Sequence, residues 1–215
     1  SFPSRGQSPK KPLILKRSEA YIGVLIDDLI SKGTEEPYRM FTSRAEFRTL
    51  LRQDNADIRL TEISYRLGLA SQDRMDKVVS KLKQVALVKK VLANTSVEAA
   101  EINPYLTGIR SATIGEKQKI NKILLRPGVA LTSLIKVIPA LHDPLSAITT
   151  DSLEQAEIQI KYERYLEKEQ EIVDRISRLE NMVIPPTFDY DKVSAISNEA
   201  LQKFKKIKPT TLGQA

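Results

Sequence analysis

Apolar residues recur with a heptad spacing over about 30 residues near the C-terminal end of the chain. They alternate at intervals of four and three, with Glu169 as the one polar interruption: Ile158, Tyr162, Tyr165, Ile172, Ile176, Leu179 and Val183. This spacing keeps one face of a helix apolar, so it predicts a single helix of roughly 45 Å that ends at Pro185-Pro186. We expect this helix to act as a strut that carries the last helices, with Tyr162 and Tyr165 buried in its seam.

Helical periodicity and helix caps also cover most of the remaining chain. Ser43 and Glu46 have the spacing of a capping box, and Ser71 caps a helix with a Met75, Val78, Leu82, Val85 stripe. Further helices are expected near 18–32, 43–53, 54–68, 72–93, 116–125, 132–138, 190–196 and 198–206. The sequence therefore predicts an all-α fold, a multi-helix bundle with one long heptad-patterned helix and a small C-terminal helical subdomain.

The same patterns suggest three regions along the chain. Residues 1–14 are polar and aperiodic, which is typical of a linker or a disordered end. We expect residues 15–150 to form a basic helical domain, and residues 151–215 to form the long helix with the C-terminal subdomain.

Composition argues against catalytic chemistry in this region. The 215 residues include no cysteine, one histidine (His142) and only eight glycines. No Gly-rich phosphate-binding loop occurs, and a thiolate metal site is excluded. We therefore expect no catalytic, cofactor-binding or metal-binding residues here. The longest apolar run is too short for a membrane-spanning helix, and no signal peptide is evident, so we expect a cytoplasmic protein without a membrane contact.

Positive charge is concentrated in the first two thirds of the chain. The net charge is +7 overall; residues 1–150 carry 24 basic and 15 acidic side chains, whereas residues 151–215 carry 10 and 12. Such a surface attracts polyanions through phosphate contacts and counterion release. The alternative is a solvated basic surface that only keeps the protein soluble.

Arginines recur every four residues in the helix expected at 43–53. Arg44, Arg48 and Arg52 would share one face, opposite an apolar face. Like charges at this spacing repel, so the arginines need partners. The partners are either carboxylates of the same chain, such as Glu46 or the Asp27-Asp28 pair, or an external anion. Spacing alone leaves both possibilities open.

Lysines are the second basic feature. Lys77, Lys81, Lys89 and Lys90 lie in one expected helix, and Lys117, Lys119 and Lys122 in another. Neither helix has enough acid nearby in sequence to neutralise it. We expect phosphate contacts from this region, which position a nucleic acid without reading its bases.

Several segments resemble the C-terminal half of the MnmG/GidA family, the tRNA uridine 5-carboxymethylaminomethyl modification enzymes. The densest match is SEAYIGVLIDDL at residues 18–29, EPYRMFTSRAEFR at 36–48 and LRQDNADIRLT at 51–61. Later segments agree, namely Leu125-Arg-Pro127, Gln159–Glu163, Ile184-Pro185, Phe188–Tyr190 and Pro209–Ala215.

The resemblance implies a function for the longer protein. Family members are homodimeric flavoproteins that bind FAD and NADH in N-terminal domains and act with the GTPase MnmE on the wobble uridine of certain tRNAs. The chain would then be their C-terminal region, which lacks the flavin domain and is not expected to be catalytic alone.

The resemblance also assigns candidate residues. We expect Arg39 and Arg48 to bind or position tRNA, with Arg44 and Arg52 in support. The phosphate contacts expected from the basic helices add these lysines to the tRNA-binding candidates: Lys89, Lys90, Lys117, Lys119 and Lys122. The C-terminal helices would dock MnmE through Tyr190, Lys203, Lys206 and Leu212. The alternative is a purely structural helical scaffold or protein-interaction domain, in which the arginines pair within the protein.

Overall fold

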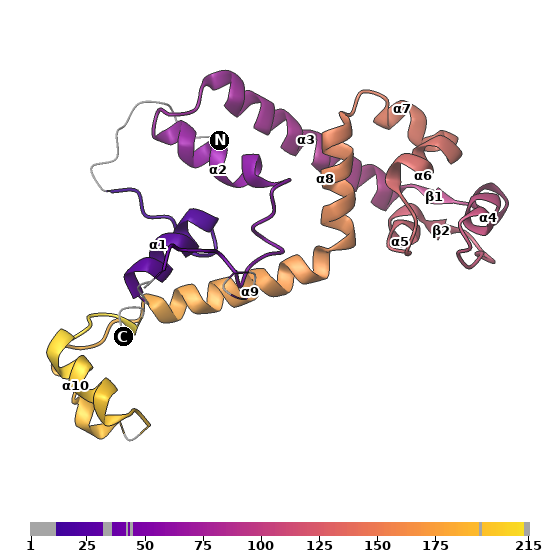
Figure 1. Cartoon of the computed structure of the whole chain (residues 1–215). Coiled ribbons are helices and arrows are strands. Elements are labelled where there is room, and N and C mark those ends of the chain that lie inside the picture. Colours follow the sequence, from indigo (N-terminus) through magenta and orange to yellow (C-terminus); the bar gives the residue numbers. More distant parts are fainter. Residues whose placement is uncertain (1–11, 32–35, 42, 44, 194, 213–215) are drawn as a thin grey trace. The chain divides into compact units, whose positions relative to one another are not determined.

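The computed structural model describes residues 12–31, 36–41, 43, 45–193 and 195–212 (Figure 1). Nearly all regular secondary structure within them is helical, and the strands there form one sheet of two short strands. The predicted all-α class is therefore confirmed. The chain divides into two compact units, Ser1–Leu166 and Glu167–Ala215, and the division falls inside a helix. Most of the expected linker lies outside the described residues.

The first unit contains most of the regular elements. In chain order they are α1 (Tyr21–Ser31), α2 (Ala56–Arg66), α3 (Gln72–Asn94), β1 (Ser96–Val97), α4 (Ala99–Gly108), β2 (Gln118–Lys119), α5 (Ile120–Leu124), α6 (Leu131–Val137), a 3-10 turn (Pro139–Leu141), α7 (His142–Leu145), α8 (Thr150–Lys161) and the beginning of α9 (Glu163–Glu180).

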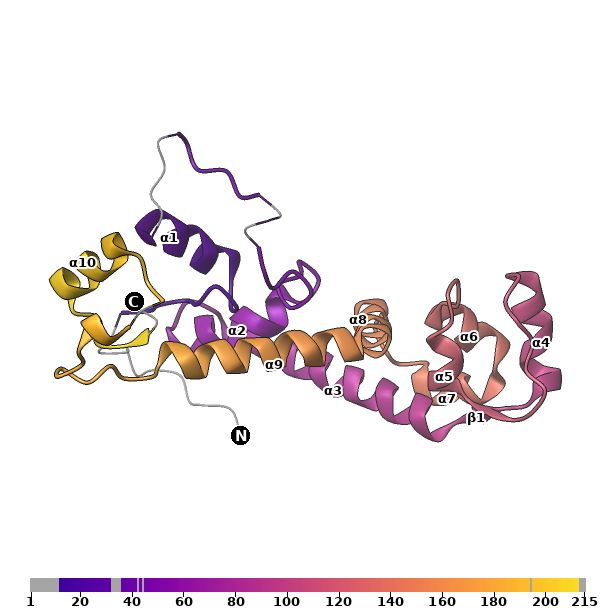
Figure 2. The same ribbon diagram turned by 90° about the horizontal axis from the view of Figure 1, so that it is seen from below.

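The core of the first unit lies between α3, α8 and the short helices that follow α3. The long helix α3 packs against both α2 and α8, and Figures 1 and 2 show α4 to α7 gathered around its C-terminal end. Leu92, Ile102, Ile123, Leu134 and Leu141 are fully buried there. Each such side chain contributes about 1.5–3 kcal/mol on burial, which stabilises helices as short as α5 and α6 that would not form alone.

The sequence predicts α3 closely, with two exceptions at neighbouring positions, Lys81 and Leu82. Ser71 Oγ accepts a hydrogen bond from Arg74 N at 3.3 Å, as expected of the cap. Met75, Val78 and Val85 are buried, but Leu82 is only partly buried. Lys81, which was expected on the solvent face, is buried instead.

The helix expected at 116–125 is shorter than predicted because Gln118 and Lys119 form a strand and the two residues before them are not helical. β1 and β2 pair antiparallel, with Ser96 opposite Lys119. Asn103 holds the loop before β2 through two hydrogen bonds to the backbone of Ile114, at 3.0 and 2.8 Å. Only Ile120–Leu124 remains helical as α5.

Helix α1 lies against the segment that precedes it. Gly23 is buried, and a Cβ at this position would lie 2.4 Å from Lys16 O and 2.5 Å from Leu15 O. Backbone oxygens cannot move aside as the tip of a side chain can, so the close approach requires glycine. The neighbouring Val24 is completely buried.

The helix expected at 43–53 is wrong. Residues 46–50 form turns, and Glu46, which a capping box needs, accepts hydrogen bonds from Arg17 instead. Backbone carbonyls that a helix would use accept side-chain donors: Thr49 O from Arg52, Leu50 O from Asn55 and Arg52 O from Arg59. Arg48 and Arg52 therefore do not share a helical face, and Arg44 lies outside the described residues.

The single long heptad helix is also wrong. α8 and α9 are separated at Tyr162, whose φ of −105° and ψ of 9° are not helical. Lys161 fixes the last turn of α8, because its Nζ donates to Val129 O and to Glu157 Oε1 at 2.6 Å each. Tyr162 and Tyr165 are 49% and 66% exposed, and no residue of α9 is buried. The seam is thus an exposed apolar stripe along α9.

The second unit contains the rest of α9, a 3-10 turn (Tyr190–Lys192) and α10 (Asn198–Ile207). Ser197 Oγ caps α10 by accepting a hydrogen bond from Ala200 N at 3.2 Å, as the sequence predicts. The two ends of the unit are joined, since Ile184 N donates to Thr210 O at 2.9 Å and Leu212 N donates to Met182 O at 3.0 Å. The helix expected at 190–196 is limited to the 3-10 turn.

Candidate nucleic-acid and partner-protein interfaces

Arg17 binds the carboxylates that lie near the N-terminal arginines. Its NH1 is 2.9 Å from Asp27 Oδ2 and 2.8 Å from Asp28 Oδ1, and its NH2 is 2.7 Å from Glu46 Oε1. Asp28 is fully buried and also accepts a hydrogen bond from the Tyr38 hydroxyl at 2.7 Å. Burial lowers the pKa of Arg17, but the hydrogen bonds to Glu46, Asp28 and Asp27 outweigh it and raise the pKa above its usual range. The Asp27-Asp28 pair therefore serves in ion pairing.

Arg39 and Arg48 differ from Arg52 in their partners. Both are exposed, and no carboxylate in the described part of the chain pairs with either. The Arg39 guanidinium lies 5.8 Å from the centre of the Phe41 ring, a cation–π distance that leaves it available to an anion. Arg52 Nε is 3.0 Å from Asp54 Oδ1, and only 18% of its side chain is exposed. Arg52 therefore stabilises the turn that holds it.

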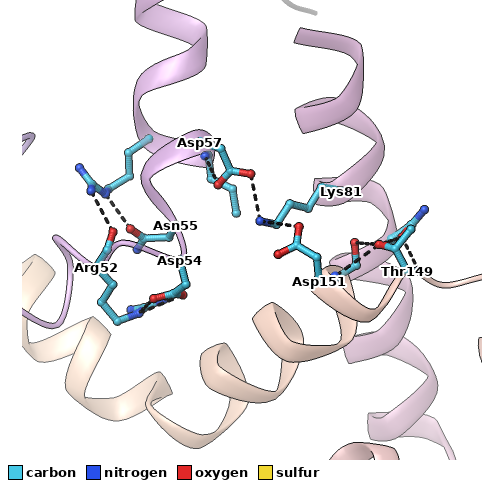
Figure 3. Close-up of polar contacts among 11 residues, drawn as sticks. Arg52, Asp54, Asn55, Asp57, Lys81, Thr149 and Asp151 are labelled. Carbon is cyan, nitrogen blue, oxygen red and sulfur yellow. Dashed lines mark hydrogen bonds and ion pairs between the residues drawn. The ribbon is translucent and has the colours of Figure 1, made fainter. Parts of the chain in front are cut away.

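Lys81 joins three helices of the first unit (Figure 3). Its Nζ lies 2.9 Å from Asp57 Oδ2 on α2 and 2.9 Å from Asp151 Oδ2 on α8. Burial lowers the pKa of Lys81, but the hydrogen bonds to Asp151 and Asp57 outweigh it, so the pKa lies above its usual value. Next to Asp151, Thr149 Oγ1 caps α8 by accepting from Ser152 N. This lysine is engaged in packing and is not available to phosphate.

Most of the other lysines expected to contact phosphate have partners within the chain, on the same helix for Lys77 and on other elements for Lys89, Lys117 and Lys119. The ion pairs are Lys77 with Asp73 (2.8 Å), Lys89 with Glu163 (3.8 Å) and Lys117 with Glu98 (2.8 Å). The hydrogen bond to Glu98 raises the pKa of Lys117. Lys119 Nζ donates to Asn94 O at 2.8 Å. Lys90 and Lys122 are exposed and pair with no carboxylate in the described ranges.

Arg110 is a candidate that sequence reasoning missed. It is exposed, has no ion-pair partner among the described residues, and has a φ of 57°, in the left-handed region. That conformation costs a residue with a Cβ about 1 kcal/mol. Its N–H donates to Thr107 O at 3.0 Å at the end of α4, and the following loop is held by a hydrogen bond from Arg126 to Ala112 O. A glycine at position 110 would have predicted this helix end from the sequence. Arginine at this position gives no such signal.

The four expected partner-binding residues fall into two groups. Tyr190 and Leu212 line the same apolar cavity in the second unit. Lys203 and Lys206 do not line it. Lys203 Nζ pairs with Glu199 Oε1 at 2.8 Å on the same helix, and Lys206 is exposed.

Two kinds of feature are absent from the described residues. Their His, Asp and Glu side chains form no group of three that could hold a metal ion. None of their helices has the length and hydropathy that crossing a membrane requires.

Two family models match adjoining parts of the chain. Residues 72–170 match the tRNA modifying enzyme MnmG/GidA C-terminal helical domain, and residues 172–215 match the MnmG/GidA C-terminal helical bundle. The two models meet close to the division between the two units. These matches place the chain among the C-terminal helical regions of tRNA-modifying enzymes.

Curated relatives and solved structures agree with this class. The chain is 51% identical over 207 residues to the tRNA uridine 5-carboxymethylaminomethyl modification enzyme MnmG of Flavobacterium psychrophilum, which covers 96% of this chain and 33% of that protein. It is 46% identical to the MnmG of Chlorobium chlorochromatii, over 95% of this chain and 33% of that protein. The chain thus spans about one third of the length of the curated relatives that it matches.

The solved structure of Aquifex aeolicus GidA in a second crystal form has a TM-score of 0.69 and 33% identity. The match covers 95% of this chain and 31% of that one. The chain therefore belongs to the MnmG/GidA family and corresponds to its C-terminal helical region.

Proposed function

We propose that this chain is the tRNA- and partner-binding region of an enzyme that installs the carboxymethylaminomethyl group on the wobble uridine of tRNA. In the complete protein, FAD and NADH would be bound by the part that precedes this region in the longer relatives, and the enzyme would act as a homodimer in the cytoplasm. The first unit would bind tRNA, and the second would dock the GTPase MnmE. The names of the relatives support the substrate class.

The distribution of carboxylates around Arg17 is the observation that carries the tRNA-binding proposal. Because Arg17 holds Asp27, Asp28 and Glu46, Arg39 and Arg48 stay exposed without these neighbours as partners. Unpaired guanidinium groups bind phosphate by charge-assisted and bidentate hydrogen bonds. In a purely structural scaffold the same arginines would only keep the surface hydrated, and their removal would leave tRNA affinity unchanged.

The test is tRNA binding by the full-length protein with Arg48→Ala and Arg39→Ala, measured over a range of salt concentrations. Each substitution should weaken binding and lower the slope of log affinity against log salt by about 1. Arg66→Ala is the matched control, since this exposed arginine already pairs with Glu62. Affinities and slopes equal to wild type for both variants would support the structural scaffold instead.

The docking proposal has a separate test. Deletion of the residues after Pro186 from the full-length protein should abolish MnmE binding and leave flavin binding and most tRNA affinity intact. A truncated protein that retains MnmE at the wild-type level would overturn the proposed role of the second unit. The isolated 215-residue chain should show no flavin spectrum and no NADH binding.

A further inference from the structure

Positive charge gathers in the lobe that residues 95–146 form around the C-terminal end of α3. Residues 107–128 carry five basic side chains and one acidic side chain: Arg110, Lys117, Lys119, Lys122, Arg126 and Glu116. Lys117 and Lys119 are engaged with other groups of the chain, as described above. Arg110 and Arg126 pair with no carboxylate in the part of the chain that the structure describes. These two arginines are therefore available to an external anion.

A loop after α4 connects the two arginines in space. Arg110 is its first residue, and the guanidinium of Arg126 donates to the carbonyl of Ala112, two residues further on. Arg126 itself lies in the turn after α5, where its backbone N–H donates to Ile123 O at 3.0 Å. Two residues that are 16 positions apart in the sequence thus meet at one loop.

The loop is held at both ends, which suits it to bind a ligand without reordering. At its beginning, the N–H of Ser111 donates to Leu106 O at 2.8 Å. At its end, the side chain of Asn103 forms two hydrogen bonds with the backbone of Ile114. The residues between these anchors are half-buried or exposed, and Ser111 and Thr113 add two hydroxyl groups.

The backbone of Arg110 supports a role for its side chain. Its φ of 57° is in the left-handed region, which is unfavourable for a residue with a Cβ and favourable for glycine. Strained residues other than glycine cluster at binding and catalytic sites. Arginine therefore occupies a position where glycine would fit the backbone better.

The composition of the lobe surface favours phosphate over an acidic protein as the ligand. All residues of the lobe are described, and Leu125 is its only large apolar side chain that is substantially exposed. Protein interfaces are centred on buried aromatic and aliphatic anchors, which this surface lacks. Guanidinium and hydroxyl groups on a rigid loop instead match the oxygens of a phosphodiester.

We infer that Arg110 and Arg126, with the loop that follows α4, bind a backbone phosphate of the RNA substrate. The inference rests on the proposed tRNA-binding function of the first unit. It adds a contact that is separate from Arg39 and Arg48, and it contributes to affinity and positioning without reading bases.

The new contact lies at the opposite end of α3 from the N-terminal arginines. Tyr65 of α2 hydrogen-bonds Gln72 at the beginning of α3, whereas Lys119 of β2 contacts Asn94 O at its end. Figures 1 and 2 show α2 and α4 near opposite ends of this helix. A helix of 23 residues is about 35 Å long. One ligand that contacts both ends must therefore be a large nucleic acid and not a single nucleotide.

The experiment measures tRNA binding by the full-length protein over a range of salt concentrations. Arg110→Gly should weaken binding about five- to tenfold at 0.1 M salt and lower the slope of log affinity against log salt by about 1. Its melting temperature should not fall, because glycine fits the left-handed conformation. Arg110→Lys should restore the slope, since it restores the charge.

Arg126→Lys tests the second arginine without removing its charge. Lysine can still donate to Ala112 O but loses the planar fork that binds phosphate in a bidentate way, so binding should weaken about threefold. Lys136→Ala is the matched control, an exposed cation of the same lobe on α6. It should bind tRNA as wild type does. Equal losses for Lys136→Ala and Arg110→Gly would indicate a diffuse basic surface and overturn the inference.

Combining the two ends of α3 sharpens the test. Arg48 belongs to the turn segment that is tied to α2 through hydrogen bonds of Asn55 and Arg59. Changes at distant sites on one ligand add in free energy. The double variant Arg48→Ala with Arg110→Gly should therefore weaken binding by the product of the two single factors. A double variant no weaker than Arg48→Ala alone would overturn the inference.

The remaining outcomes separate the inference from the proposed function. If Arg39→Ala and Arg48→Ala weaken tRNA binding while Arg110→Gly and Arg126→Lys bind normally, the proposed function stands and the inference fails. If all four bind tRNA as wild type does, both fail. If the two lobe variants lose MnmE binding and keep tRNA affinity, the ligand is an acidic protein surface and the inference is overturned.

Discussion

The two units of this chain are stabilised by different means. The first is built around a contiguous core in which side chains such as Leu92, Ile123 and Leu134 are completely buried. In the second, Pro209 alone among the described residues is buried. The second unit is held together by a short backbone pairing of Val183 with Thr211, by contacts between aromatic rings and by surface ion pairs.

The two units therefore differ in how much of their stability comes from buried apolar surface. Burial contributes about 25 cal/mol per Å² of apolar surface, so the first unit gains most of its stability from its core. A unit of fewer than about 50 residues buries little and is marginal by itself. Large apolar side chains are exposed in both units, such as Ile30 and Leu69 in the first and Val183 in the second, but among the described residues only the first unit also has a buried core.

The largest expected effect tests the core of the first unit. Leu92→Ala should lower the free energy of unfolding by about 2–5 kcal/mol, because it leaves a cavity in a packed interior. Leu87→Ala on the same helix, where leucine is 43% exposed, should cost below about 1 kcal/mol, and so should Leu179→Ala in α9. Urea unfolding followed by circular dichroism measures all three. Equal losses of unfolding free energy for Leu92→Ala and Leu179→Ala would contradict the difference between a buried core in the first unit and exposed apolar residues in α9.

The second prediction concerns the buried lysine of the first unit. Lys81→Met should destabilise the chain by about 1–2 kcal/mol, because two carboxylates lose a charged hydrogen-bond donor but can still be hydrated. Lys77→Met, one turn earlier, removes an exposed pair with Asp73 and should cost below about 0.5 kcal/mol. Thermal unfolding of the two variants at neutral pH provides the measurement, and equal shifts would show that burial of Lys81 does not matter.

The pH dependence of the same variant gives a third prediction. The pKa of Lys81 is raised in the folded state, so its contribution to stability is fully present below the unfolded pKa of about 10.4 and is lost as the pH rises through the higher folded pKa. The difference in stability between wild type and Lys81→Met should therefore shrink above about pH 10.4. A difference that stays constant up to pH 12 would contradict the ion pairing of Lys81.

A fourth prediction tests the stability of the second unit by removing the aromatic ring of Tyr190. The Tyr190 ring lies 5.1 Å from that of Phe188 and 5.9 Å from that of Phe204. Tyr190→Ala should destabilise this unit by about 1–2 kcal/mol through lost ring contacts. Amide hydrogen exchange should accelerate between residues 182 and 212 and stay unchanged in α3 and α8. Acceleration across both units would show that they unfold together.

The smallest expected effect is at the surface of the second unit. Lys203 and Glu199 form an exposed pair, in which the hydrogen bond raises the pKa of Lys203 and lowers that of Glu199. Surface pairs of this kind contribute little. Lys203→Ala should leave the unfolding midpoint unchanged within error, and a clear drop would mean that the unit depends on its surface ion pairs.

The sequence predicts helices whose determinants are local. Ser71 with the stripe that follows it defines α3, and Ser197 defines the beginning of α10, because a cap and an apolar period lie within a few residues of each other. The predicted helix at 43–53 fails because Glu46 is bound by Arg17, 29 residues away. No local pattern shows that competition.

Distant contacts also explain what the sequence leaves undetermined in the candidate sites. Lys81 has the spacing of a solvent-facing lysine, but acids from α2 and α8 bury it. The heptad seam predicts an apolar stripe correctly, yet it cannot show whether anything covers that stripe. The exposed arginines Arg39 and Arg48 could be chosen from the resemblance, whereas Arg110 requires the structure.

The contact of Gly23 with the carbonyls of Leu15 and Lys16 has a consequence for mutational tolerance. Every single-nucleotide missense change of a glycine codon introduces a Cβ, and at this position the Cβ would lie within 2.5 Å of backbone oxygen. Only synonymous changes at the third base of codon 23 are therefore expected to be tolerated. A saturation library of residues 15–30 should recover glycine almost exclusively at this position, even though the exposed face of the same helix accepts many residues.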